Sequence, residues 1–173
     1  MVIIRKAQTS DANAIARVHI ASWQVVYRGH VPDEVLSNLS LNEREQMWHE
    51  LLEKNVNVLV ILKDNNLVGF ISFGTSRDKQ DDPLQVAEIT ALYIMPNEWR
   101  NGFGKTLLNT AISSISKSNF KKVILWVVDS NQQAKNFYGI NGFINSHEIK
   151  VEQREKYSVR QAKFFKELLV LSN

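Results

Sequence analysis

The chain has 173 residues and a formal net charge of +3, which fits one domain, residues 1–173, that can bury a sizeable core. It contains no cysteine, which excludes disulfides, thiol catalysis and thiolate metal sites. Its basic residues are scattered and its four histidines lie far apart, so we expect neither a nucleic-acid partner nor a metal site. It shows no signal-peptide pattern and no membrane-length apolar run, so we expect a cytoplasmic protein without a membrane partner.

The first part of the chain is predicted to contain one strand and three helices. These elements cover residues 2–6, 9–28, 33–39 and 42–54. On the first helix, His19, Trp23 and Tyr27 are spaced four residues apart, so their rings can meet on one side. Core packing is the default explanation of this aromatic line, and a pocket for a substrate is the alternative.

The remainder alternates between strands and helices. The predicted strands cover residues 57–63, 67–75, 88–95, 121–128, 144–151 and 159–169, and the predicted helices cover residues 102–118 and 131–138. The first two of these strands form a hairpin through Asp64-Asn65-Asn66, and Ser76 to Pro83 reads as a polar loop. The apolar run from Lys121 to Val128 is typical of a strand buried on both faces, usually in parallel pairing. We therefore predict a mixed α/β fold with helices on both faces of one sheet.

One stretch indicates an anion site. The strand from Glu88 to Met95 is broken by Pro96, and a polar turn leads into Gly102-Phe103-Gly104 and then into a helix. A strand followed by a glycine turn and a helix N-terminus presents unpaired backbone N–H groups to an anion, most naturally a phosphate. A glycine turn that binds no ligand is the alternative.

Three phosphate-binding motifs compete for these glycines. A Walker A loop requires a glycine where Trp99 stands, and a dinucleotide-binding fingerprint requires one where Leu107 stands. The third pattern is [QR]-x-x-G-x-[GA] directly after a strand, the pyrophosphate loop of the GCN5-related N-acetyltransferases. Gly102 and Gly104 match it, whereas its first position is Trp99 and Arg100 comes one place late.

A second motif of that family occurs further along the chain. The family pattern is N-x-x-A-x-x-[FY]-Y-x-x-x-G-F, and the matching residues are Asn131, Ala134, Phe137, Tyr138, Gly142 and Phe143. Residues 4–23 also look like the family's first strand and helix. The chain therefore resembles the GCN5-related N-acetyltransferases over nearly its whole length. This resemblance implies a three-layer α/β/α fold whose central mixed, mostly antiparallel sheet is splayed between its fourth and fifth strands. It also implies acetyl-CoA as cosubstrate, without a metal.

The resemblance places the pantetheine arm of the cosubstrate in the splay. There the N–H of Leu92 would face the thioester carbonyl and stabilise the oxyanion, and the N–H and C=O of Ile94 would hold the arm. Backbone amides of residues 100–105 would hold the pyrophosphate, and Asn131 would contact the arm from the other side. The predicted cofactor-binding residues are Leu92, Tyr93, Ile94, Arg100, Asn101, Gly102, Phe103, Gly104, Lys105, Thr106, Asn131 and Phe137.

Two residues carry the chemistry that the resemblance implies. Tyr138 matches the tyrosine that protonates the departing thiolate, and a phenol, with an ordinary pKa of about 10, suits this role. The alternative is that Tyr138 only packs under the sheet. Glu88 lies where histone-type members place a glutamate, and it could accept the amine's proton directly or through water. The alternatives are a solvent-facing or lysine-paired glutamate, with ordered water as the base.

We therefore expect an N-acetyltransferase that moves an acetyl group to a primary amine of a small molecule, a protein N-terminus or a lysine, by direct attack in a ternary complex. A non-catalytic acyl-CoA-binding module on the same fold is the rival, and a nucleotide binder that requires Mg²⁺ is a third reading. The acceptor would lie near Trp23, Tyr27, Tyr157 and the loop 76–83, where Asp81 and Asp82 tilt the expectation toward a cation. The protein would be a monomer or a homodimer.

Overall fold

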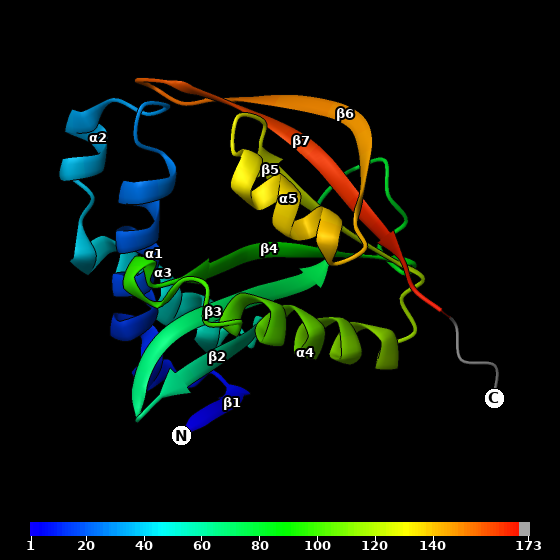
Figure 1. Cartoon of the computed structure of the whole chain (residues 1–173), viewed down its shortest axis with the longest axis horizontal. Helices are drawn as coiled ribbons and strands as arrows, with labels where there is room; N and C mark the ends of the chain where they lie inside the picture. Colours follow the sequence, from blue (N-terminus) through cyan, green and yellow to red (C-terminus); the bar gives the residue numbers. More distant parts are fainter. Residues whose placement is uncertain (170–173) are drawn as a thin grey trace. The chain divides into compact units, whose positions relative to one another are not determined.

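The computed structural model describes residues 1–169, shown in Figure 1. The strands are β1 (Val2–Lys6), β2 (Asn57–Lys63), β3 (Asn66–Thr75), β4 (Val86–Ile94), β5 (Lys122–Val128), β6 (Ile144–Gln153) and β7 (Ser158–Glu167). The helices are α1 (Ala12–Val26), α2 (Asp33–Ser37), α3 (Leu41–Glu53), α4 (Phe103–Lys117) and α5 (Gln132–Ile140), with short 3-10 turns η1 (Thr9–Asp11) and η2 (Pro96–Glu98).

The strands are hydrogen-bonded in the order β1-β2-β3-β4-β5-β7-β6. The β1–β2, β2–β3, β5–β7 and β6–β7 pairs are antiparallel, and β4 pairs with β5 in parallel. The parallel ladder joins Val86–Ile89 to Lys122–Leu125, whereas the two strands run on to Ile94 and Val128. This confirms the predicted mixed, mostly antiparallel sheet, with pairing between the fourth and fifth strands limited to their first halves.

By internal contacts the chain divides into two compact units, so the expectation of one domain stays a prediction. The first unit comprises residues 1–73 and 91–111, and the second comprises residues 74–90 and the chain from Ile112 onward. Strand β4 and helix α4 each contribute residues to both.

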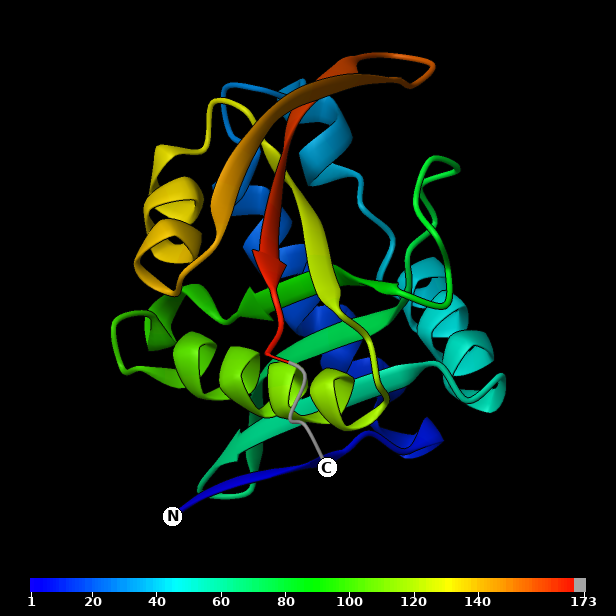
Figure 2. The same cartoon turned by 90° about the vertical axis from the view of Figure 1, so that its right-hand side faces the viewer.

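The first unit has its core between α1, α3 and one face of the β2–β3 hairpin. Ile15, Trp48, Val60 and Phe70 are buried there, and Figure 2 shows β2 and β3 between these two helices behind and α4 in front. Alternation along β2 sends Val58 and Val60 to the same side. Helix α3 begins at Ser40, whose hydroxyl accepts a hydrogen bond from the N–H of Glu43, as one of the two predicted caps requires.

Several predicted boundaries differ from the observed ones by two residues, among them the end of α2, which was expected at Leu39 and lies at Ser37. The first helix was expected to reach Arg28, but it ends at Val26, because Gly29 adopts a positive φ of 80° that turns the chain away from the helix. The last strand was expected to reach Leu169 and ends at Glu167. By contrast, the hairpin turn occurs where it was predicted, and Asp64 and Asn65 both take the positive φ that a tight two-residue turn needs.

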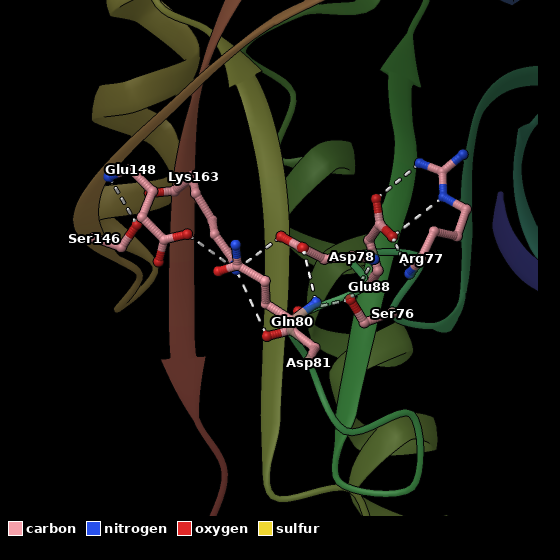
Figure 3. A network of polar contacts seen from close by, with 9 residues as sticks. All are labelled: Ser76, Arg77, Asp78, Gln80, Asp81, Glu88, Ser146, Glu148 and Lys163. Atoms are coloured by element: carbon pink, nitrogen blue, oxygen red, sulfur yellow. Dashed lines mark hydrogen bonds and ion pairs between the residues drawn. The ribbon is translucent and has the colours of Figure 1, made fainter.

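The second unit is built around β5, which is buried along most of its length. Register pairs Trp126 with Lys163 and Glu88 with Ile124, so the side chains of Glu88, Trp126 and Lys163 share one face of the sheet. The loop 76–83 lies in front of this face, and helix α5 lies behind the strands (Figure 3). One face of this unit is therefore covered by a polar loop rather than by a helix.

Candidate active site

The end of β4 exposes one edge of its backbone in the first unit. The N–H of Met95 donates to the carbonyl of Val68 on β3, at 2.8 Å. Because successive peptide groups of a strand point to opposite edges, the backbone groups of Leu92 and Ile94 face away from β3. These are the residues whose N–H groups were expected to hold the pantetheine arm.

The carbonyl of Ile94 is already occupied within the protein. It accepts a hydrogen bond from the indole N–H of Trp99 at 2.8 Å and another from the hydroxyl of Ser22 at 3.2 Å. A carbonyl oxygen has two lone pairs, so both are used. The expected contact between this carbonyl and the arm is corrected accordingly: an arm that used it would have to displace Trp99 or Ser22. The indole at the degenerate first position of the loop motif thus has a structural role.

The glycine turn after β4 forms an open backbone nest. Arg100 and Gly102 both take positive φ, 66° and 79°, and helix α4 begins directly after them. The first N–H groups of a helix have no acceptor within it. In α4, the N–H of Thr106 is the first to donate a hydrogen bond of the helical type, to the carbonyl of Gly102 at 3.0 Å. Glu98 braces the turn through Lys63, at 2.9 Å, and through the side-chain amide of Asn101. The predicted strand, turn and helix are confirmed, and anion binding by them stays a prediction.

The aromatic line of α1 belongs to a packed cluster. Trp23 stacks on Tyr27 with centroids 4.4 Å apart, and its indole donates to the hydroxyl of Tyr93 at 3.1 Å. His19 stacks on Tyr93 and accepts a hydrogen bond from the indole of Trp48 at 3.0 Å. Burial raises the pKa of Tyr93. The default explanation, packing, accounts for these contacts. An acceptor-binding role for Trp23 and Tyr27 stays a prediction, as does cofactor binding by Tyr93.

Because His19 is buried, we expect the stability of the fold to fall in acid. Burial, together with the charge of Arg44, lowers its pKa to about 3, so it stays neutral in the folded chain while an unfolded histidine takes up a proton below about pH 6.5. The unfolded state then binds more protons, and stability falls as the pH falls through this window. We expect His19 alone to cost about 2 kcal/mol of unfolding free energy between about pH 7 and pH 5. Urea titrations at the two pH values measure this loss. His19→Asn, which keeps an acceptor for Trp48 without titrating, should remove it, and an equal loss in that variant would contradict the assignment.

The second motif has a local structural explanation in the second unit. The side-chain oxygen of Asn131 caps α5 by accepting from the N–H of Ala134 at 3.0 Å. Gly142 takes a φ of 87°, which turns the chain from α5 into β6. Tyr138 is half-buried on α5, and its ring meets those of Phe137 and Phe143 edge to face, at 5.2 and 5.6 Å. These contacts fix the position of the phenol, and its acid role stays a prediction, as do cofactor contacts of Asn131 and Phe137.

Glu88 is a buried carboxylate held by one arginine. Its side chain is 3% exposed, and three N–H groups of Arg77 reach it (Figure 3). The backbone N–H and Nε donate to Oε2 at 2.9 and 3.2 Å, and Nη2 donates to Oε1 at 2.8 Å. Glu88 is therefore neither solvent-facing nor paired with a lysine, the alternatives that the sequence left open. A direct base role, which stays a prediction, requires the guanidinium to move first.

A buried lysine that was not predicted lies on the same face. Lys163 is 5% exposed, and its ammonium lies 3.0 Å from Asp78, 3.6 Å from Asp81 and 3.5 Å from Glu148 (Figure 3). Its hydrogen bond lowers the pKa of Asp78. The available signal was the position of Lys163 between Ala162 and Phe164 in a predicted strand, where alternation decides which face it takes.

The acidic side chains Asp81 and Asp82 of the loop accept hydrogen bonds from other residues of the protein. Asp81 contacts Lys163 and also accepts from the hydroxyl of Ser76 at 2.7 Å, and Asp82 accepts from the N–H of Leu84 at 2.9 Å. Asp81 is neutralised by Lys163, so it does not favour a cationic acceptor, whereas Asp82 is exposed and has only a backbone N–H as partner, and the tilt toward a cation stays a prediction there. Tyr157 is half-buried near the β6–β7 turn, where its carbonyl accepts from the N–H of Arg154 at 2.8 Å; its acceptor-binding role stays a prediction.

Comparison with known proteins agrees with the family resemblance that the strand β4, the glycine turn and the helix α4 indicate. The model of the Acetyltransferase (GNAT) family matches residues 21–143, which is most of the chain. An uncharacterised N-acetyltransferase of Bacillus subtilis, YuaI, is 31% identical over 131 residues, which cover 76% of this chain and 74% of that protein. The chain therefore belongs to the GNAT family, and it is an acyl-CoA-dependent N-acetyltransferase.

Other relatives are known in more detail. A spermidine N(1)-acetyltransferase of Thermoplasma acidophilum is 27% identical over 146 residues, covering 81% of this chain and 86% of its own. The crystal structure of the PaiA N-acetyltransferase of the same organism, in complex with coenzyme A, superposes with a TM-score of 0.71 at 24% identity, covering 97% of this chain and 99% of that one. The YncA protein of Salmonella typhimurium, solved with acetyl-CoA, has a TM-score of 0.73 at 17% identity, with 100% and 96% coverage. These structural likenesses establish the fold. Among residues 1–169, no helix combines the length and apolar character needed to cross a membrane.

Proposed function

We propose that this chain transfers the acetyl group of acetyl-CoA to a primary amine by direct attack in a ternary complex. The observation that carries the proposal is the backbone nest at Arg100–Gly102, which leads from the free edge of β4 into the N-terminus of α4. Such a nest suits a pyrophosphate, and the strand edge suits an extended amide-bearing arm. Relatives solved with coenzyme A and with acetyl-CoA support this choice of cosubstrate.

The reaction needs three functions. The neutral amine attacks the thioester carbonyl, and the N–H of Leu92 stabilises the oxyanion that forms. The C–S bond then breaks, and the phenol of Tyr138 gives its proton to the departing thiolate. The proton that the new amide nitrogen loses passes to Glu88, directly or through water. No acyl-enzyme is needed, which agrees with a chain that has no cysteine.

We propose a small amine as the acceptor. A relative that acetylates spermidine supports a small amine as the acceptor. We propose that the reaction takes place in the cytoplasm, with the protein acting as a monomer or a homodimer. A protein N-terminus or a lysine remains the alternative acceptor.

The test is an acetylation assay with purified protein. Acetyl-CoA is mixed with spermidine, with putrescine, with free lysine or with peptides that offer one free amine, and released coenzyme A and the acetylated product are both measured. We expect turnover with at least one small amine. Binding of acetyl-CoA with neither release of coenzyme A nor transfer to any amine would instead support a non-catalytic acyl-CoA-binding module, and release of coenzyme A without an acetylated amine would show hydrolysis and contradict the proposed transfer.

A further inference from the structure

The two buried charges of the second unit are neutralised in different ways. Lys163 is surrounded by three carboxylates from the loop 76–83 and from β6, and its side chain is 7% exposed. Glu88, also buried, is ion-paired among residues 1–169 with Arg77 alone, whose side chain is 70% exposed, while the charge of Lys150 on β6 acts on it without an ion pair. A buried carboxylate needs a cation. At Glu88 that cation is a side chain which solvent already reaches.

The guanidinium of Arg77 can move away from Glu88 while the loop 76–83 keeps its position. The backbone N–H of Arg77 bonds Oε2 of Glu88 independently of the side chain. The same loop is held separately, by the ion pair of Asp78 with Lys163 at 3.0 Å and by the bond between Ser76 and Asp81. Rotation of the Arg77 side chain therefore frees Oε1 of Glu88 and keeps a hydrogen bond on Oε2.

A second acid acts on the guanidinium at longer range, although its own ion-pair partner is Arg154. The hydrogen bond to Glu88 is the main cause that raises the pKa of Arg77, and the charge of Glu152 on β6 contributes as well. Arg77 thus lies within electrostatic reach of two carboxylates, one buried and one nearer to solvent.

We infer that Arg77 occupies the place of the acceptor's ammonium group, and that a cationic acceptor binds by displacing its guanidinium from Oε1 of Glu88. Arg77 is then a specificity-determining residue, because only a ligand that brings its own positive charge can replace it without leaving Glu88 buried and unpaired. The acceptor class that fits is an amine that carries a cationic group, and putrescine is a simple probe of that class. This inference rests on the proposed function, because it takes the bound cation to be the acceptor of the acetyl group. The binding of the cation itself needs no acetyl-CoA.

The first experiment measures cation binding alone. The melting temperature of the purified chain is followed against putrescine, and against succinate as an anion of similar length, without acetyl-CoA. The variants are Arg77→Ala and, as a matched control, Asp78→Asn, which weakens the other anchor of the same loop and leaves Arg77 on Glu88. We expect Arg77→Ala to melt lower than the wild type, to be raised by putrescine more than the wild type is, and to bind putrescine at least about fivefold more tightly. Asp78→Asn should bind it like the wild type.

Three outcomes would overturn the inference. Unchanged or weaker putrescine binding in Arg77→Ala would show that the guanidinium does not compete with a cation. Equal tightening in Asp78→Asn would show that loop order, rather than a vacant carboxylate, is responsible. Succinate binding that is lost in Arg77→Ala would show that Arg77 receives an anion. If Arg77→Ala does not fold, Arg77→Gln keeps most of the side-chain volume and carries the same test.

Kinetics separate this inference from the proposed function. If the chain acetylates putrescine, Arg77→Ala should lower the KM for putrescine and leave the KM for acetyl-CoA unchanged. If the chain acetylates no amine, the proposed function is wrong, and the putrescine-binding experiment still tests the inference about Arg77. A KM for putrescine that rises in a folded Arg77→Ala variant would contradict the exchange.

Discussion

Replacement of Tyr138 by phenylalanine should lower kcat by roughly a hundredfold to ten-thousandfold and leave the affinity for acetyl-CoA nearly unchanged. The phenylalanine ring keeps the edge-to-face contacts with Phe137 and Phe143, so α5 should stay in place. Only the proton that the departing thiolate needs is removed. Steady-state rates, together with calorimetric titration of acetyl-CoA into the variant, measure the two effects separately.

A thioester with a more acidic thiol provides the control. Its thiolate leaves without help, so the Tyr138→Phe variant should lose much less activity with it than with acetyl-CoA. Equal losses with both donors, or a loss of affinity as large as the loss of rate, would contradict the acid role and make Tyr138 a packing residue.

Replacement of Lys163 by methionine should destabilise the fold by roughly 3 kcal/mol, because it leaves Asp78 and Asp81 without their shared cation. The two carboxylates are 20% and 15% exposed, so water replaces the lost ammonium poorly. Methionine retains most of the side-chain length, so the packing of β7 is largely preserved. Urea unfolding at neutral pH measures the change.

A double variant tests whether charge is the cause. Addition of Asp78→Asn to Lys163→Met removes one of the unpaired carboxylates and should restore part of the lost stability. If the two substitutions instead add their separate costs, the destabilisation comes from packing, and the ion pair contributes little.

Local signals predicted the strand, the glycine turn and the helix. Proline at 96, glycines at 102 and 104 and the helical spacing after them each constrain their own few residues, and the chain follows them. The same holds at Ser40, which caps α3, and at Asp64 and Asn65, whose positive φ makes the hairpin turn. In each case the residues that make the feature are neighbours in the sequence.

The charged interior of the second unit depends on residues far apart in the chain. Lys163 and Asp78 are separated by 85 positions, and no local pattern pairs them. Glu88 was predicted as a base because it lies where histone-type members of the family place a glutamate, whereas its partner Arg77 comes from the loop that precedes β4. The carbonyl of Ile94 was likewise assigned to the cofactor, since the hydroxyl that it bonds lies 72 positions away on α1. Sequence patterns place a residue on a strand face, and the fold decides what meets it there.

Calorimetric titration of the wild-type chain with acetyl-CoA, with ATP and Mg²⁺ titrated in parallel, tests the cosubstrate directly. We expect micromolar binding of acetyl-CoA and no heat from ATP, because the nest at Arg100–Gly102 suits a pyrophosphate and Trp99 takes the place of the glycine that a nucleotide-binding loop requires. Binding of ATP without acetyl-CoA, or binding of neither, would contradict the account.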